Sequence, residues 1–305
     1  MRRVCIFILP LLTCLACIDN TIFNPVTQFK SDTASIRSFL ELDGIKATMT
    51  PQGVWYSIDD STLGYYPALS DSVVIKYTAW LLPTNLPNNQ IPISSLKKAG
   101  SSATTKSSSR TVLLSSVISG IQLGLSKFPV GSSGKLFIPS GLAFGPVVQD
   151  SVPANSNLVY EIKLMSATGA RVSAEQGVID NYVSSISDDL FSQGLKQSKD
   201  ATSGIRFAYD TIITANSAPT LNSSVNISYS ASVLNAITPF VTSTDTTLVL
   251  KDQITAFKII FPEIRIGTTF WIYVPSSYAY GSDSPSLLVP ANSNLIYQIT
   301  LKDVR

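Results

Sequence analysis

The chain has 305 residues, of which 45% are hydrophobic and only 14% are charged, and its 22 basic side chains nearly balance its 20 acidic ones. There is no histidine, and the three cysteines, Cys5, Cys14 and Cys17, lie at the N-terminus. Catalytic triads, thiol nucleophiles in the folded part and histidine or cysteine metal sites are therefore excluded, and the near-neutral charge argues against nucleic-acid binding. The function classes that remain open are carboxylate, hydroxyl or lysine chemistry, catalysis by an apolar pocket, and plain binding. The length allows about two domains.

The first 17 residues are typical of a targeting signal. Arg2 and Arg3 precede an apolar run, Val4–Leu12, that is too short to cross a bilayer. The signal ends in LAC, which resembles the lipoprotein box of bacteria, so we expect Cys17 to carry a lipid. Cys14 is the second candidate, and an ordinary secretory signal is the alternative. The sequence thus predicts a protein of the cell envelope, lipid-anchored to a bacterial membrane and facing the periplasm or the surface.

The rest of the sequence contains the same pattern twice. IPSGLAFG and VPANSNL in the first copy correspond to VPSSYAYG and VPANSNL in the second. Matching residues are 136 positions apart at Gly145 and Gly281 but 152 apart at Tyr77 and Tyr229, so the first copy holds about 16 extra residues. We place these in Pro83–Arg110, a stretch rich in Ser, Thr, Asn and Pro that predicts an exposed, mobile excursion.

The first copy predicts a helix, then strands, a short helix and further strands. Ile36, Phe39 and Leu40 have helical spacing, and Gly44 is suited to end this helix. Residues 117–125 predict the short helix. The strands are indicated by alternating apolar side chains, at Val73, Ile75 and Tyr77, at Leu136 and Ile138, and at Leu158, Tyr160, Ile162 and Leu164.

The second copy repeats this order. Ser173–Gln176 has the spacing of a capping box, which marks the start of a helix. Residues 254–260 predict a short helix that Pro262 stops, and alternation predicts strands at Phe270, Ile272 and Val274 and at Leu295, Tyr297, Ile299 and Leu301. Because no βαβ alternation is present, the predicted fold class is α+β, with a curved antiparallel sheet wrapped on one short helix in each copy.

Together these motifs resemble the FKBP-type peptidyl-prolyl isomerases. The resemblance rests on the strand ending in Tyr229, on Ile266-Gly267 before a strand, on VPSSYAYG, and on VPANSNLIY ending at Tyr297. The arrangement of signal, helix and tandem domains is similar to lipoproteins of Bacteroidota-type bacteria. The resulting organisation is a signal peptide (1–17), a linker and helix (18–52), a first FKBP-like domain (53–167, with a flexible insertion at 83–110), a helix and linker (168–203) and a second FKBP-like domain (204–305).

The family implies a hollow lined by aromatic side chains that receives a proline ring. Carried over by motif, the catalytic residues of the second copy are Tyr229, Phe240, Phe257, Tyr280 and Tyr297, and its substrate-binding residues are Ile254, Leu288 and Val289. The matching residues of the first copy are Tyr77, Ile118, Ile121, Phe144, Val152 and Tyr160. The hydroxyl of Tyr280 is expected to donate to the substrate carbonyl, while Phe257 stands where the family usually has a tryptophan. For Tyr160 and Tyr297 a core role remains an alternative.

Both copies depart from the family pattern. In the second, Phe240 is followed by Val241 where the family has an aspartate, unless Asp245 reaches in from the same loop. In the first, Phe144 lacks the hydroxyl of its counterpart, and Ile121 replaces the aromatic floor. The second copy is therefore the expected working site. Apart from that possible role of Asp245, three carboxylates are predicted to be solvated turn residues, namely Asp71, Asp245 and Asp283.

Prolyl isomerisation needs no titrating group, metal or cofactor, because an apolar pocket and one fixed donor can favour the twisted amide over the planar one. The leading hypothesis is a membrane-anchored isomerase that helps exported proteins to fold, with proline-containing polypeptide segments as partners. The alternative is a pseudo-isomerase module that binds such segments without turnover. A weaker alternative is a cell-envelope scaffold that contacts a partner through residues 83–110. The sequence leaves the oligomeric state open.

Overall fold

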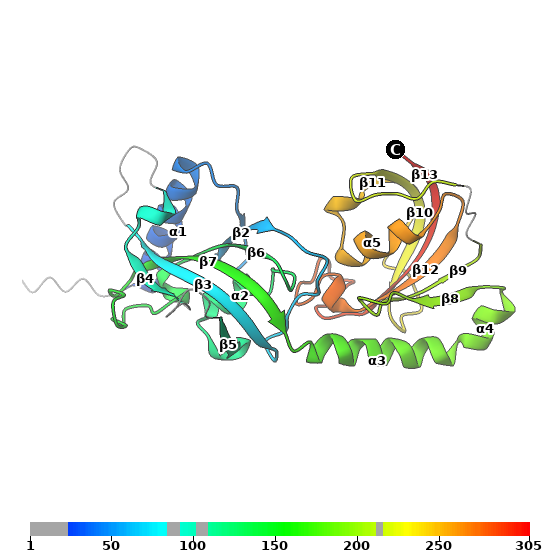
Figure 1. The fold of residues 1–305 in the computed structure, drawn as a ribbon, viewed down its shortest axis with the longest axis horizontal. Coiled ribbons are helices and arrows are strands. Elements are labelled where there is room, and N and C mark those ends of the chain that lie inside the picture. Colours follow the sequence, from blue (N-terminus) through cyan, green and yellow to red (C-terminus); the bar gives the residue numbers. More distant parts are fainter. Residues whose placement is uncertain (1–23, 84–91, 102–108, 212–215) are drawn as a thin grey trace, which may run out of the picture.

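The computed structural model describes residues 24–83, 92–101, 109–211 and 216–305. Within these ranges no helix has the length and apolar character that crossing a membrane requires. The predicted signal peptide and Cys17 lie outside the described residues. The described chain forms two α+β halves, each with its own antiparallel sheet, which we name domain 1 (residues 24–167) and domain 2 (residues 170–305) (Figure 1). The predicted fold class is confirmed.

Domain 1 contains one sheet with helices on both of its faces. Its sheet has the strand order β1-β2-β6-β7-β3-β4, and β5 also pairs with β3. The short helix α2 packs on one face and α1 on the other. The elements are α1 (Pro25–Leu42), β1 (Thr48–Met49), β2 (Trp55–Asp60), β3 (Ser72–Leu82), β4 (Lys98–Ser101), β5 (Arg110–Leu113), α2 (Ser119–Leu125), β6 (Ser133–Ile138) and β7 (Asn157–Ala167).

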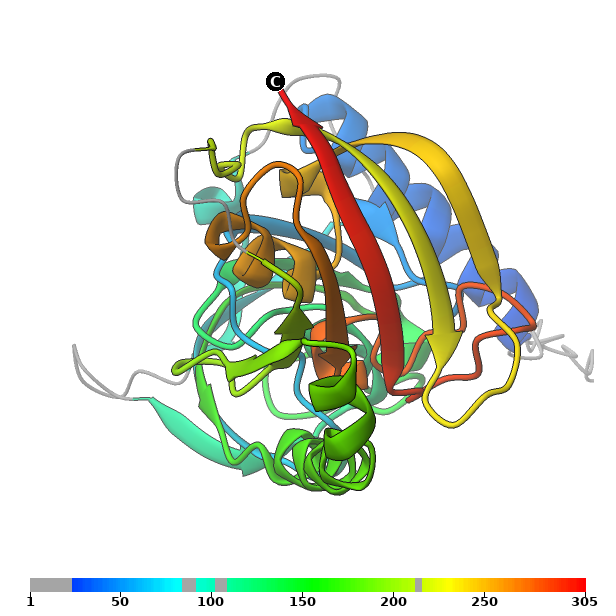
Figure 2. The same cartoon turned by 90° about the vertical axis from the view of Figure 1, so that its right-hand side faces the viewer.

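Domain 2 repeats this architecture. Its sheet has the order β11-β10-β13-β12-β9-β8, and Figure 2 shows β11, β10 and β13 curving together side by side. Helix α5 packs inside the curve and α3 outside it. The elements are α3 (Ala170–Ser185), α4 (Ser187–Ser192), β8 (Lys196–Lys199), β9 (Arg206–Tyr209), β10 (Ser224–Val233), β11 (Val241–Val249), α5 (Thr255–Ile260), β12 (Thr269–Val274) and β13 (Leu295–Val304).

Strand β12 shows how the sheet serves two cores. Phe270 and Ile272 point into the cluster around α5, whereas Tyr273, between Ile272 and Val274, joins the cluster under α3. Successive side chains of a strand point to opposite faces, so a strand covered on both faces is apolar at consecutive positions. Phe270 meets Phe261 edge-on at 5.3 Å between ring centroids, which fixes the helix end of α5 against the sheet.

The described part of the insertion is packed rather than wholly exposed. Ile93 and Leu96 are buried in the cluster formed by α1 and Trp80, and β4 pairs with β3. The prediction of an exposed, mobile excursion over 83–110 is therefore wrong for this part. Ile93 and Leu96 lie among polar neighbours in the sequence, and α1 together with the outer face of the sheet supplies the apolar surface that buries them. Residues 84–91 and 102–108 lie outside the described residues.

The helix termini agree only partly with the sequence patterns. Gly44, with φ of +65°, directly follows the C-cap of α1 as predicted, since this left-handed conformation suits glycine. The capping box predicted at Ser173 is wrong, because α3 begins at Ala170, after Gly169, and no side chain caps it. Ser173 therefore lies inside the first turn. Glu175, the third residue of that motif, instead contacts Ser277 in the loop between β12 and β13.

Candidate functional site

Seven of the eight residues proposed for the second hollow meet in one apolar cluster of domain 2. Four come from the strands and from α5 with its N-cap, Phe240 directly precedes β11, and the other two come from the loop between β12 and β13. Phe257, Val289 and Tyr297 are buried in this cluster, while Tyr229, Phe240, Ile254 and Tyr280 pack on it and remain partly exposed. Leu288 does not join it and is 66% exposed. The buried members thus form a floor and the partly exposed members a rim.

The floor is aromatic and rigidly packed. The rings of Phe257 and Tyr297 meet edge-on with centroids 4.9 Å apart, and Phe261 packs behind Phe257 at 5.1 Å. Phe257 and Tyr297 are each 4% exposed. Edge-to-face aromatic contacts add to the burial of apolar surface, so this floor holds its shape without a bound partner. An apolar ring such as that of proline is the complement of such a surface.

The floor and the rim are joined by two phenol hydroxyls. Burial raises the pKa of Tyr297, and Tyr280, whose hydroxyl forms a hydrogen bond with that of Tyr297, raises it further. The two hydroxyls therefore meet where the floor joins the rim, and the hydroxyl of the partly exposed Tyr280 can both donate and accept.

Asp245 does not replace the carboxylate that is missing after Phe240. It lies on β11 and accepts a hydrogen bond from Nδ2 of Asn226 at 2.6 Å. Asn226 stands between the buried Val225 and Ile227 on β10, so its side chain lies on the opposite face of the sheet from the hollow. Asp245 is exposed, as predicted, and faces away from Phe257.

The six residues proposed for the first hollow also meet in a single cluster. Ile121, Val152 and Tyr160 are buried, and Tyr77, Ile118 and Phe144 pack beside them. The rings of Tyr77 and Tyr160 lie 5.5 Å apart. Burial, with a smaller contribution from Tyr77, raises the pKa of Tyr160 to about 12. In the loop between β6 and β7, Phe144 stands at the position that corresponds to Tyr280. This position therefore offers no hydroxyl partner to Tyr160.

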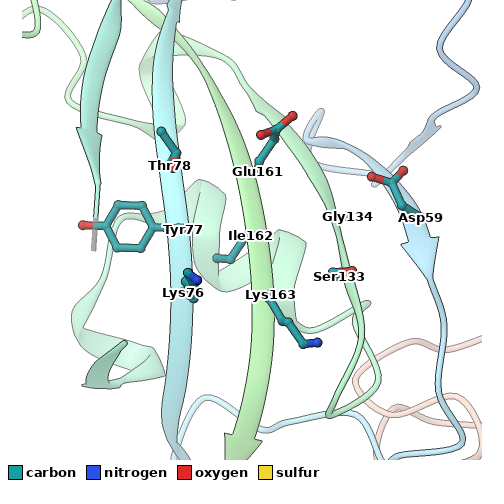
Figure 3. Close-up of a pocket in the computed structure, with 9 residues that line it drawn as sticks. All are labelled: Asp59, Lys76, Tyr77, Thr78, Ser133, Gly134, Glu161, Ile162 and Lys163. Carbon is teal, nitrogen blue, oxygen red and sulfur yellow. The ribbon is translucent and has the colours of Figure 1, made fainter. Parts of the chain in front are cut away.

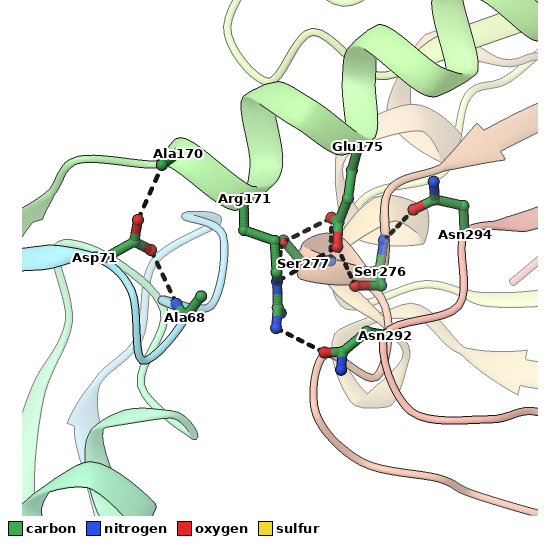
Figure 4. Close-up of polar contacts among 9 residues, drawn as sticks. All are labelled: Ala68, Asp71, Ala170, Arg171, Glu175, Ser276, Ser277, Asn292 and Asn294. Atoms are coloured by element: carbon green, nitrogen blue, oxygen red, sulfur yellow. Dashed lines mark hydrogen bonds and ion pairs between the residues drawn. The ribbon is translucent and has the colours of Figure 1, made fainter. Parts of the chain in front are cut away.

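A carboxylate that the sequence analysis missed holds the loop that carries Tyr280 (Figure 4). Glu175 of α3 accepts hydrogen bonds from the hydroxyls of Ser276 and Ser277 and from the backbone N–H of Ser277 at 3.0 Å. Arg171, one turn earlier, pairs with Glu175 and donates to Oδ1 of Asn292 at 2.6 Å. Helix α3 therefore fixes both ends of the loop between β12 and β13.

Domain 1 contains the same arrangement. Asp32 of α1 accepts from the backbone N–H and the hydroxyl of Ser140 at 2.9 and 2.6 Å, and Gln28 donates to Asp32 at 2.7 Å. Asn157 also accepts from the N–H of Ser140, as Asn294 does from that of Ser276. In the sequence this contact is indicated by an acidic residue on each N-terminal helix and by a Pro-Ser pair after the matching strand. Only the packing of the folded chain shows that the acid and the serine contact each other.

Asp71 is not the solvated turn residue that was predicted. It is 1% exposed and accepts from the backbone N–H groups of Ala68 at 2.8 Å and Ala170 at 3.0 Å, and from the hydroxyl of Thr168 at 3.0 Å. These bonds tie domain 1 to the first residue of α3, as Figure 4 shows. Asp283 is exposed, as predicted, but forms an ion pair with Lys127 of domain 1.

A groove of about 280 Å³ on the outer face of the sheet of domain 1 is a separate feature (Figure 3). It is lined by side chains of both signs, among them Asp59, Lys76, Glu161 and Lys163. These charges are exposed and stand on adjacent strands, and Asp59 pairs with Lys135. Exposed pairs of this kind contribute little free energy, and the groove lies on the opposite face from Tyr160. Its charged side chains lie on the solvated face of the sheet, while Tyr77 and Ile162 of the first cluster border the groove from the sheet itself.

A family model supports the comparison of the two halves. The model described as FKBP-type peptidyl-prolyl cis-trans isomerase matches residues 64–165 and again residues 215–302. Each match contains the strands, the short helix and the loop that form one of the two hollows. Among the described residues no group of three or more acidic side chains could hold a metal ion.

Curated proteins and solved structures show similarity over parts of the chain. "Outer membrane protein MIP" of Legionella longbeachae is 33% identical over 121 residues, which are 39% of this chain and 46% of that protein. FkpA of Escherichia coli K12, an FKBP-type isomerase by its name, is 28% identical over 43% of each chain. The chain thus spans less than half the length of these relatives. The crystal structure of Escherichia coli FkpA aligns with a TM-score of 0.37 and 25% identity, over 47% of this chain and 63% of that one.

Proposed function

This chain belongs to the FKBP-type peptidyl-prolyl cis-trans isomerase family, and from that premise we propose that it isomerises prolyl bonds in exported polypeptides, with domain 2 as the working site. The observation that carries the proposal is the pair of hydroxyls on Tyr280 and Tyr297, placed beside the aromatic ring of Phe257. This pair joins an apolar aromatic floor to a hydroxyl on the rim that can donate to a carbonyl. Domain 1 lacks the donor because Phe144 stands in its place.

The arrangement suits a reaction that breaks no covalent bond. The rotation barrier of a peptide bond is about 18–20 kcal/mol and is set by amide resonance. The planar amide is more polar than the twisted one, so transfer from water to the floor formed by Phe257 and Tyr297 disfavours the planar form. The hydroxyl of Tyr280 can hold the carbonyl near the proline and stabilise the charge that remains on it. No step requires a change of protonation.

The test is proline-limited refolding of a denatured protein in the presence of the full chain. We expect acceleration, and a loss of about tenfold in Tyr280→Phe, the amount that one hydrogen bond of about 1.4 kcal/mol supplies. Tyr182→Phe is the matched control, because Tyr182 packs against Tyr273 on the outer face of the same sheet. A refolding rate equal to the uncatalysed rate would contradict the proposal.

The alternative, a module that binds proline-containing segments without turnover, is favoured by one observation. The residue after Phe240 is Val241, and Asp245 lies on the other face of the sheet, so neither position supplies the carboxylate that the family has beside this phenylalanine. The alternative predicts that the chain binds an unfolded proline-rich peptide while refolding rates stay unchanged. Peptide binding measured by fluorescence anisotropy, alongside the refolding assay, separates the two functions.

Anchoring and localisation are part of the same proposal. We infer that Cys17 carries a lipid that tethers the protein to a membrane of the cell envelope, where exported chains fold. Replacement of Cys17 by Ser is expected to release the protein from the membrane fraction and to abolish incorporation of a radiolabelled fatty acid. Cys14→Ser is the matched control, and persistence of label in Cys17→Ser would assign the lipid elsewhere.

A further inference from the structure

A cavity lies beside Tyr280, between the two domains. Its volume is about 150 Å³. It is lined by Tyr56, Tyr66, Ser126 and Lys127 of domain 1 and by Ala279, Tyr280 and Asp283 of domain 2. Tyr280 also packs on the aromatic cluster of domain 2 and bonds to Tyr297, so it forms the wall between this cavity and the candidate site. A ligand in this cavity would therefore lie next to a ligand at the candidate site.

Contacts across the interface fix the position of this cavity. The ion pair of Lys127 with Asp283 joins the domains on one side, and the side chain of Lys127 is only 16% exposed. The backbone N–H of Tyr66 donates to the carbonyl of Ser277 at 2.9 Å. Tyr66 also comes close to Gly281, where a Cβ would lie 4.0 Å from the Cβ of Tyr66. Domain 1 therefore directly borders the segment that carries Tyr280.

Domain 1 also supports the helix that forms the floor. The hydroxyl of Tyr66 forms a hydrogen bond with the side chain of Thr255, the first residue of α5. The adjacent residue, Ile254, belongs to the proposed rim of the hollow. Tyr65 extends the same contact, since its ring meets that of Tyr278 edge-on at 6.2 Å. Two neighbouring tyrosines of domain 1 thus contact both the helix and the loop of the candidate site.

The lining has the chemistry of a site for peptide groups. Burial raises the pKa of both Tyr56 and Tyr66, so their hydroxyls remain neutral and can each donate and accept. Ser126 adds a third hydroxyl, and the ion pair adds a charge of each sign. A peptide unit offers one donor and one acceptor, which matches such a lining better than an apolar side chain does. The volume equals that of about five water molecules, enough for one such unit.

We propose that this cavity is a subsite of domain 2 for the stretch of polypeptide next to the bound proline, and that Tyr66 and Lys127 of domain 1 are specificity-determining residues. The proposal rests on the proposed function of domain 2. It gives domain 1 a role that does not depend on the hollow of domain 1, in which Phe144 stands at the position that corresponds to Tyr280. Substrates with several residues beside the proline then bind across both domains, and a short peptide reaches only the hollow.

The test compares affinity for short and long peptides, using the full chain. The probes are the fluorescein-labelled tetrapeptide Ala-Leu-Pro-Phe and the same sequence with four alanines added at its N-terminus or at its C-terminus. We expect one of the long peptides to bind about tenfold more tightly than the tetrapeptide. In Tyr66→Phe and in Lys127→Ala this ratio falls about fivefold, the amount expected for one lost hydrogen bond. Ser126→Phe, which fills the cavity without removing a bond across the interface, brings the ratio close to one.

The control is Lys76→Ala, which removes a lysine from the outer sheet face of domain 1 and leaves the ratio unchanged. Equal affinity of the native chain for all three peptides overturns the proposal, and so does an unchanged ratio in all three interface variants. A fall in affinity for the tetrapeptide as large as that for the long peptide also overturns it, because it would indicate a general disturbance of domain 2. Failure of the proposed function is separate, since it appears as unaccelerated refolding whatever the affinity ratio.

Discussion

Domains 1 and 2 have the same architecture and the same helix-to-loop contacts but different hollows. The acid on the N-terminal helix holds the loop in both, through Asp32 in one and Glu175 in the other. The loop itself carries Phe144 in domain 1 and Tyr280 in domain 2. The residues that maintain the fold are thus kept in both copies, while the hydroxyl at this position of the loop is present in only one. This difference separates what the fold needs from what the proposed reaction needs.

The largest expected effect tests whether the two helix-to-loop contacts are equivalent. Glu175→Ala leaves the hydroxyls of Ser276 and Ser277 and one buried N–H without their acceptor, at about 1 kcal/mol or more for each group. We expect domain 2 to lose about 3 kcal/mol of unfolding free energy, and domain 1 to lose a similar amount in Asp32→Ala. Urea denaturation measures both.

Glu161→Ala is the matched control for these two variants, because Glu161 is exposed on the outer face of its sheet. Its unfolding free energy is expected to stay within about 0.5 kcal/mol of the native value. A loss in Glu175→Ala no greater than in this control would show that the contact does not stabilise domain 2.

The next effect concerns the floor of the hollow. Phe257→Ile gives domain 2 the residue type that Ile121 supplies in domain 1, and it removes the ring that meets Tyr297. We expect a stability loss of about 2 kcal/mol from the smaller side chain, together with a clear fall in refolding catalysis. Phe191→Ile is the control, since Phe191 is 82% exposed on α4. Full catalysis in Phe257→Ile would mean that the ring is only a core residue.

Alkaline pH offers a smaller, graded test of domain 1. Burial raises the pKa of Tyr160 from 10.0 to about 12, so the folded state holds the phenol proton more tightly than the unfolded state. The resulting stabilisation is complete below pH 10 and is lost as the pH rises from about 10 to about 12. Urea denaturation at a series of pH values is expected to show this loss, and Tyr160→Phe is expected to make it shallower. An identical pH profile in Tyr160→Phe would count against the assignment.

The smallest expected effect is a gain of function in domain 1. In a chain whose domain 2 carries Tyr280→Phe, the further change Phe144→Tyr restores a hydroxyl opposite Tyr160. We expect refolding catalysis to rise by about twofold, because the floor at Ile121 remains aliphatic. Phe144→Leu in the same background is the control and gives no rise. Equal rates in the two variants would show that the hydroxyl alone does not distinguish the domains.

Much of the fold could be predicted because it depends on local and periodic patterns. The alternation around Tyr160 and Tyr297 identified the strands and their buried faces, and the repeat of VPANSNL revealed two copies. The capping box at Ser173 failed because α3 begins earlier, at Ala170, and Gln176 donates instead to the carbonyl of Ser203, a partner that spacing along one helix cannot show. Leu96 was missed because its burial depends on α1, which lies far away in the sequence.

The sequence by itself determined the repeated α+β fold, the family and most of the residues that meet in each apolar cluster, since these follow from periodicity and from motifs that the chain carries in contiguous blocks. Only the tertiary structure decided which polar groups meet. Asp71 became a buried acceptor, Asp245 faced away from Phe257, and Tyr66 came to lie beside Tyr280. Each of these outcomes depends on how the two sheets and α3 are placed in space, and hydrogen-bond partners brought together from distant segments leave no periodic trace in the sequence.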